Sequence, residues 1–283
     1  MLPPVRRLTL AAAGLVYSAD NPTKKAARMR THLTRTLLAA ALLSGALPAL
    51  AESTQVDVRV LARGAKFIGG YSDSARVVLT DADTGEVLAR GLTQGTTGDT
   101  QRILAGGVDG DKRLSTPDSA VYRATLDLAK PRRVTATVTG PLSQPQATTT
   151  VTSTQWLLPG RHVTQGDGWV LELPGLVVDL VEPAAFQPVK AGTTLPLQVA
   201  VTMMCGCALS EDGPWKAGAV EVDYQVTVNG KAQPLQRMTF DSASGRYNAS
   251  IVPRDAGIHE IEIRAWDAEG GNAGVARTAV FVR

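Results

Sequence analysis

A stretch of nine residues, 220–228, alternates apolar and polar side chains with a period of two and runs directly into Asn229-Gly230. This period is typical of a strand with one buried and one exposed face, whereas a helix needs a period near 3.6. An Asn-Gly pair readily adopts the positive φ angles of a tight hairpin. The stretch therefore predicts a β-strand that continues into a hairpin of an antiparallel sheet.

Similar alternation recurs along the chain, and helical periodicity hardly competes with it. Glycine and proline are plentiful, at 27 and 16 residues, while aromatic residues make up only 5% of the chain, which favours β-structure with many turns. We expect further strands at 56–60, 75–79, 86–89, 120–126, 133–138, 195–201, 245–249, 256–267 and 278–282. The sequence therefore predicts an all-β protein.

The first 51 residues read as a targeting region. A complete signal peptide is predicted at 29–51, with Arg30 and Arg35 before an apolar run and Ala49-Leu50-Ala51 as the cleavage motif. The apolar run is too short to span a membrane. Residues 1–28 form an upstream extension, and Met29 is the expected start; a twin-arginine signal at Arg6-Arg7 is the alternative. We expect a periplasmic or secreted protein without a transmembrane segment in its mature part.

Removal of this region changes the charge balance. Seven of the 29 Lys and Arg residues lie in the first 51, but only one of the 26 Asp and Glu residues does, so the remainder carries a net charge of −3. The basic balance of the whole chain thus belongs to the targeting region. We therefore expect no nucleic-acid binding, and the partner that fits an exported chain is another exported protein.

About 230 residues follow the signal peptide, enough for two ordinary domains. Pro159, Gly160, Gly166 and Gly168 mark the expected junction. We predict an N-terminal β-sandwich at 52–157, a linker at 158–168 and a C-terminal β-sandwich at 169–283.

Three segments resemble known families. Residues 75–98 (ARVVLTDADTGEVLARGLTQGTTG) resemble the opening of carboxypeptidase-regulatory or transthyretin-like sandwiches. Residues 245–272, with G-x-Y, a strand containing His259 and a final Gly-Asn, resemble bacterial immunoglobulin-like and fibronectin-III-like domains. Met-Met-Cys-Gly-Cys followed by Gly-Pro-Trp is similar to a pattern in an uncharacterised exported bacterial protein family. The resemblance implies immunoglobulin-like sandwiches in tandem, with adhesion, spacing or enzyme-accessory roles.

Most of the chemical specificity lies in the segment 203–207, Met-Met-Cys-Gly-Cys, which contains both cysteines of the chain. If the strand before it stays regular, Met203, Cys205 and Cys207 lie on the core side and Met204 faces outward. His259 has the parity of the apolar residues in its own strand, so it should also point inward.

Sulfur ligands favour Cu(I), and Gly206 lets the backbone fold so that two thiolates converge. We therefore predict a soft-metal site, with Met203, Cys205, Cys207 and His259 as ligands and His162 as a further candidate. The expected cofactor is copper(I) or none.

Three other interpretations remain open. An oxidising compartment favours a Cys205–Cys207 disulfide, although alternate residues of a straight strand lie about 6.5 Å apart at Cα, so the bond needs a kink at Gly206. The same pair could exchange thiols as a redox element. The segment could also simply fill the end of a sandwich.

Enzyme motifs are absent. The sequence contains no G-x-S-x-G, H-E-x-x-H, P-loop or dinucleotide fingerprint. Asp81, Asp83 and Glu86 are residue types that bind calcium, but their spacing predicts a hairpin turn. We expect a non-enzymatic binding protein or, alternatively, a structural or adhesive module.

Overall fold

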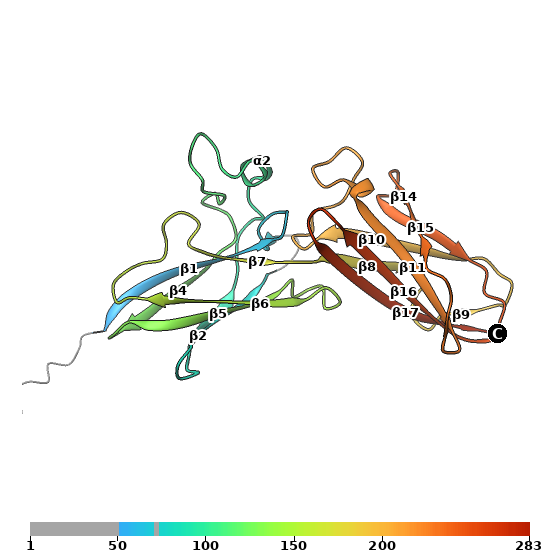
Figure 1. The fold of residues 1–283 in the computed structure, drawn as a ribbon, viewed down its shortest axis with the longest axis horizontal. Coiled ribbons are helices and arrows are strands. Elements are labelled where there is room, and N and C mark those ends of the chain that lie inside the picture. The colour runs from blue at the N-terminus through green and yellow to red at the C-terminus, as the bar shows by residue number, and fades with distance from the viewer. Residues whose placement is uncertain (1–50, 71–73) are drawn as a thin grey trace, which may run out of the picture. The chain divides into compact units, whose positions relative to one another are not determined.

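The computed structural model describes residues 51–70 and 74–283 (Figure 1). The upstream extension and the predicted signal peptide lie outside these residues, apart from Ala51. The described part is almost entirely β-structure, as the sequence predicts, and it contains four sheets. Within it, no helix has the length and apolarity needed to cross a membrane.

Seven strands form the first pair of sheets, in the orders β4-β1-β7 and β3-β2-β5-β6. Their bounds are β1 (Glu52–Ala62), β2 (Arg76–Asp81), β3 (Val87–Leu92), β4 (Tyr122–Leu128), β5 (Arg132–Gly140), β6 (Thr149–Leu157) and β7 (Trp169–Leu173). Buried residues alternate along β1 and β5, so the two sheets pack by their apolar faces. A short helix, α2 (Thr100–Leu104), follows β3, and the Asp99 side chain accepts a hydrogen bond from the backbone N–H of Arg102 at its N-terminus.

Ten strands form the second pair of sheets, in the orders β14-β15-β10-β8 and β12-β11-β16-β17-β9, with β13 also on β11. Their bounds are β8 (Leu176–Glu182), β9 (Pro188–Val189), β10 (Leu195–Met203), β11 (Val220–Val228), β12 (Lys231–Ala232), β13 (Gln236–Arg237), β14 (Thr239–Asp241), β15 (Arg246–Ile251), β16 (Gly257–Asp267) and β17 (Asn272–Val282). A short 3₁₀ turn, η2 (Ala217–Ala219), precedes β11.

The strand order of the second pair is that of an immunoglobulin-like sandwich. In that fold the first, second, fourth and fifth strands form one sheet, and the third, sixth and seventh form the other. Here β8, β10, β14 and β15 make the first set, and β11, β16 and β17 make the second. The hairpin predicted after residue 228 is confirmed, because Val228 pairs with Lys231 and both Asn229 and Gly230 have positive φ.

The chain passes from the first pair of sheets to the second between β7 and β8. β7 pairs with β1 in parallel, while β8 pairs with β10. Residues 169–173 therefore belong to the first pair of sheets by hydrogen bonding, although they follow the predicted linker at 158–168. The predicted domain limits, as limits of independently folding units, stay a prediction.

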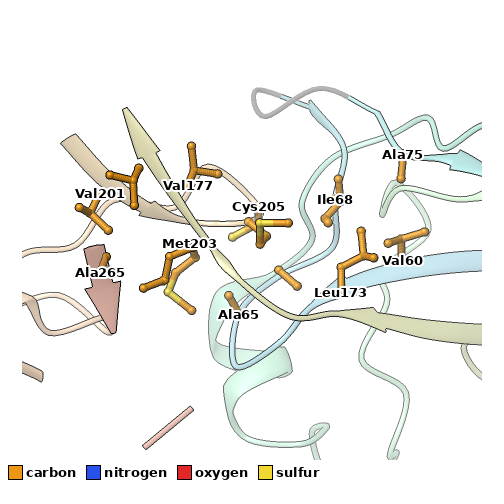
Figure 2. Packing of buried hydrophobic residues seen from close by; sticks show 14 of the residues in the cluster. Val60, Ala65, Ile68, Ala75, Leu173, Val177, Val201, Met203, Cys205 and Ala265 are labelled. Carbon is orange, nitrogen blue, oxygen red and sulfur yellow. The ribbon is translucent and has the colours of Figure 1, made fainter. Parts of the chain in front are cut away.

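The buried apolar side chains of both pairs of sheets form one contiguous cluster. Figure 2 shows this cluster where the chain passes between the pairs, with Met203 and Cys205 of the second pair near Ala65, Ile68 and Leu173 of the first. Burial on this scale is the main favourable contribution to folding. The segment singled out by its sulfur atoms is therefore part of the core that the two pairs share.

Candidate functional site

The segment 203–207 forms a tight hairpin turn at the end of β10. The backbone N–H of Met203 donates to the carbonyl of Cys207 (3.0 Å), and that of Gly206 donates to the carbonyl of Met203 (2.8 Å). Gly206 has a φ of +74°, and Thr202 pairs with Ala208 just outside the turn. This is the three-residue hairpin loop in which glycine occupies the left-handed position.

The turn brings the two cysteines together as a disulfide. The Cα atoms of Cys205 and Cys207 are 5.4 Å apart, within the range for a disulfide. The required departure from a straight strand is present at Gly206, where the backbone bends through its positive φ. No cysteine of the described residues is free.

Both methionines of the turn are buried. Met203 is 3% exposed, as expected, but Met204 is 1% exposed, so the prediction that Met204 faces outward is wrong. The alternation of β10 ends at Met203, because the turn begins there and redirects the next side chain. Met204 lies against Gly175, where an added Cβ would come within 3.3 Å of its sulfur.

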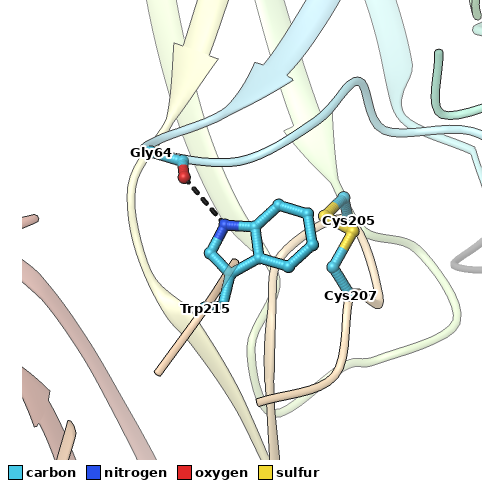
Figure 3. Close-up of a disulfide and its surroundings, with 4 residues drawn as sticks. All are labelled: Gly64, Cys205, Cys207 and Trp215. Atoms are coloured by element: carbon cyan, nitrogen blue, oxygen red, sulfur yellow. Dashed lines mark hydrogen bonds between the residues drawn. A yellow bond between two sulfur atoms is a disulfide. The ribbon is translucent and has the colours of Figure 1, made fainter. Parts of the chain in front are cut away.

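Trp215 lies beside the disulfide and reaches the first pair of sheets. Its indole N–H donates a hydrogen bond to the carbonyl of Gly64 (2.9 Å), and Figure 3 shows the ring next to the Cys205–Cys207 bond. The loop that carries Trp215 is closed by a hydrogen bond from the Ser210 N–H to the Trp215 carbonyl (3.0 Å). In the sequence, Gly-Pro-Trp stands out only as part of a recurring pattern.

A buried tyrosine holds the end of this loop. The hydroxyl of Tyr247, in β15, donates to the carbonyl of Ala217 (2.8 Å), and Ala217 in turn donates its N–H to Ser210 (2.9 Å). Burial raises the pKa of Tyr247 from its ordinary value of 10.0 to about 12. The phenol thus stays neutral and keeps its hydrogen bond over the physiological pH range.

A buried asparagine makes a further polar link between the pairs of sheets. Asn272, at the start of β17, is fully buried. Its side-chain oxygen accepts from the N–H of Gly175 (2.9 Å), and its amide nitrogen donates to the carbonyl of Arg63 (3.4 Å) and to Asp267 (3.2 Å). The sequence marked Gly271-Asn272 only as a turn, because an asparagine that serves distant backbone groups looks like any turn residue.

The four predicted metal ligands are not all brought together. Met203, Cys205 and Cys207 share the turn, whereas His259 lies near the start of β16, opposite Val228. The end of β16 near the turn is Asp267, which lines a pocket with Met203. Asp267 follows His259 by eight positions of extended strand, which corresponds to about 26 Å.

The other residues that the sequence suggested as metal ligands form hydrogen bonds within the protein. His162 accepts a hydrogen bond from the N–H of Gln55 (3.1 Å) through its Nδ1. Asp81 accepts from the backbone N–H groups of Asp83 and Thr84 (2.9 Å each) in the β2–β3 turn, and the Thr84 N–H is the main cause that lowers the pKa of Asp81. Among residues 51–70 and 74–283, no three His, Cys, Asp or Glu side chains are grouped so that they could hold a metal ion.

Comparison with known proteins gives no family. No protein-family model matches the sequence, and a search of curated proteins finds no match. Solved structures do match in part. An engineered protein is 17% identical with a TM-score of 0.29, and the match covers 45% of this chain and 24% of that one, about a quarter of its length.

Two further matches cover more of both chains. Fibronectin(III)-like modules of Clostridium thermocellum CbhA are 14% identical over 82% of this chain and 94% of theirs, with a TM-score of 0.27. The titin domains z1z2, solved in complex with telethonin, are 13% identical over 83% and 89%, with a TM-score of 0.24. At these values the matches carry no functional argument, and the immunoglobulin-like assignment rests on the strand order itself.

Proposed function

We propose that this chain is a non-enzymatic exported module, periplasmic or secreted, that spaces or presents binding surfaces, and in which the Cys205–Cys207 turn holds two β-sandwiches together. The observation that carries the proposal is the hydrogen bond from Trp215, which lies beside the disulfide turn, to the carbonyl of Gly64. An immunoglobulin-like strand order fits such a role, although a fold alone does not select it.

The small size of the disulfide loop supports a local role for the bond. A loop closed between residues two apart gains little stability from the chain-entropy effect. The bond therefore contributes mainly by restricting the turn against which Trp215 packs. Cys205 is 2% exposed, whereas Cys207 is partly buried.

The polar link through Asn272 supports the same role. The buried amide of Asn272 donates to the carbonyl of Arg63 in the first pair of sheets while it is held by Gly175 and Asp267. Separation of the two pairs would leave the Arg63 carbonyl without this partner unless water replaced it. Trp215 and Asn272 reach consecutive residues of the first pair, Gly64 and Arg63. Trp215 does so from the loop before β11 and Asn272 from the start of β17.

A second candidate function is Cu(I) binding by the reduced turn. It is favoured by the four sulfur atoms of Met203, Met204, Cys205 and Cys207 within five residues, since soft sulfur ligands select Cu(I). It requires the disulfide to be reduced by a thiol donor, and His259 would not take part. Thiol exchange with a partner protein is the corresponding redox alternative.

The mass of the protein isolated anaerobically, with alkylation of thiols before and after reduction, separates these functions. A metal-free chain two hydrogens lighter than the dithiol form, alkylated only after reduction, supports the structural module. A chain that carries one copper ion and two alkylatable thiols after denaturation overturns it in favour of the metal carrier.

Hydrogen exchange then tests the joint between the two sandwiches, by which we mean the disulfide turn at 203–207, Trp215, Asn272 and the loop around Gly64. In the Cys205→Ser/Cys207→Ser variant we expect faster amide exchange at 203–217 and at 62–66 than in the oxidised protein, because the packing of Trp215 is loosened. The amides of β5 serve as the internal control and should not change. Unchanged exchange at 62–66 would contradict a role of the turn in holding the two sandwiches.

A further inference from the structure

The edge strands of the four sheets differ in how they are protected from pairing with another chain. A free edge presents unpaired backbone N–H and C=O groups, and proteins usually protect it with charge, proline or very short length. Every edge strand of the described residues except β6 has such a device. The protecting residues are Arg90 in β3, Arg123 and Asp127 in β4, Glu172 in β7, Asp179 and Glu182 in β8, Pro188 in β9, Lys231 in β12, Arg237 in β13 and Asp241 in β14.

β6 lacks all of these devices. Its nine residues, Thr-Thr-Val-Thr-Ser-Thr-Gln-Trp-Leu, include no charged residue and no proline. Its backbone pairs with β5 along the whole length, and outside that pairing no described backbone group bonds to it. Half of its backbone groups therefore point away from the sheet. A strand of this length and composition is a template for a further strand.

The two faces of β6 are clearly distinguished. Ser153 on the inner face accepts a hydrogen bond from the indole N–H of Trp169 (3.2 Å), which ties the strand to the opposite sheet. The outer face carries Thr150, Thr152 and Thr154, and it ends at Trp156, whose side chain is 60% exposed. An indole this exposed on the outer face of a sheet is available for contact with a partner.

We propose that β6 pairs with β6 of a second copy of this chain, antiparallel and centred on Ser153, so that two four-stranded sheets become one continuous sheet of eight. In this register all nine residues overlap. Thr152 faces Thr154 of the other copy, so threonine pairs with threonine. The strand contains no charged residue, so no repulsion between like charges arises. Trp156 faces Thr150 of the other copy, a small side chain over which the indole can lie.

The second copy is favoured over an unrelated partner by the outer face of β6, which carries Thr150, Thr152 and Thr154 and no charged residue. A second β6 brings the same threonine row to the edge, and threonine pairs opposite each other stabilise neighbouring strands. Thr150 already donates or accepts a hydrogen bond with Thr139 of β5 (2.9 Å), and Thr154 does so with Thr135 (2.8 Å), so the hydroxyl rows continue across the new strand pair. In the two-fold pairing each β6 edge is covered by the other, so association stops at the dimer and does not continue into a fibre.

Sedimentation equilibrium of the mature protein, without the predicted signal peptide, tests the proposal. We expect a closed dimer at about 100 μM protein that dissociates on dilution. The Thr152→Lys/Thr154→Lys variant places two pairs of added ammonium groups directly opposite each other, so we expect dimerisation to weaken by about tenfold or more. Association equal to that of the wild type in this variant would overturn the proposed register.

A charge-complementary variant keeps the test independent of folding. In Thr152→Lys/Thr154→Glu, each added lysine faces an added glutamate of the other copy, so the dimer should persist. This variant changes the same two positions as the double-lysine variant and differs from it only in the sign of one charge. Thr125→Lys, on the exposed face of the edge strand β4, is the matched control and should not change association. A wild-type chain that stays monomeric while binding an extended peptide of another sequence would assign the edge to a different partner and overturn self-pairing.

Discussion

The indole N–H of Trp215 donates a hydrogen bond to the carbonyl oxygen of Gly64, a residue 151 positions earlier in the chain. The same ring lies beside the Cys205–Cys207 disulfide. One side chain thus lies beside the sulfur turn of the second pair of sheets and is hydrogen-bonded to the loop after β1 of the first. The sulfur segment that the sequence singles out therefore lies where the two pairs of sheets meet.

Removal of the Trp215 hydrogen bond tests its contribution to the joint. Trp215→Phe keeps an aromatic ring but loses the N–H, so we expect the free energy of unfolding to fall by about 1 kcal/mol. Urea denaturation monitored by circular dichroism measures the change. The control is Trp266→Phe, since Trp266 is 45% exposed and donates no hydrogen bond to a described residue, and it should change stability much less.

We expect replacement of the buried Asn272 to lower the free energy of unfolding more than replacement of Trp215 does. Asn272→Ala leaves the Gly175 N–H without its acceptor inside the joint, and we expect a loss of about 2 kcal/mol in the free energy of unfolding. Asn248→Ala, which removes one partly buried amide from the β10–β15 pair, is the control and should cost less. Equal costs for the two variants would argue against a special role of Asn272.

An acidic replacement at the same position adds a pH test. Asn272→Asp keeps an acceptor for Gly175 but sets a second carboxyl beside Asp267, in place of a hydrogen-bonded amide. The two like charges raise the pKa of the new carboxyl in the folded state. Stability of this variant should therefore fall as pH rises above about 4, whereas the wild type should show no such loss there.

Tyr247 predicts a loss of stability at alkaline pH. Because burial raises its pKa from 10.0 to about 12, the unfolded chain releases the phenolic proton before the folded protein does. The stability contribution of the neutral phenol is complete below pH 10 and is lost as pH rises toward 12. Tyr247→Phe should reduce this slope in urea titrations between these pH values. An unchanged slope would mean that other groups cause it.

Gly206, which has a left-handed backbone conformation in the sulfur turn, allows a test of how far that conformation requires glycine. Gly206 has a φ of +74°, so Gly206→Ala forces a side chain into a region that L-residues avoid and should cost about 1 kcal/mol of unfolding free energy. Gly206→Asn should cost less, because asparagine tolerates this conformation. Thermal unfolding of the oxidised proteins compares the two. Equal losses would show that space in the turn, rather than the backbone angle, limits the position.

Much of the secondary structure followed from local pattern. β11 and its Asn229-Gly230 hairpin, the Asp81 turn and β16 were predicted correctly, because one buried face imposes a period of two and the turn residues supply the required φ angles. α2 was not predicted, since five residues are too few to show a helical period. The short strands β12, β13 and β14 carry too little pattern for the same reason.

The candidate site was predicted in part. Sequence composition was sufficient to single out Cys205 and Cys207 and to require a bend at Gly206. It could not place Met204, because a turn ends the alternation on which parity arguments depend. It also suggested His259 as a partner of the cysteines, although the two lie toward opposite ends of the sandwich, since residue parity gives the face of a strand but not which strand ends meet.

The sequence by itself determined the strand class, the main turns and the unusual sulfur segment, since all three depend on neighbours within a few residues. Only the tertiary structure decided what the sulfur segment touches. Trp215, Gly64, Gly175 and Asn272 lie far apart in sequence, and they meet because two pairs of sheets bury a common apolar cluster and must satisfy the backbone groups trapped beside it.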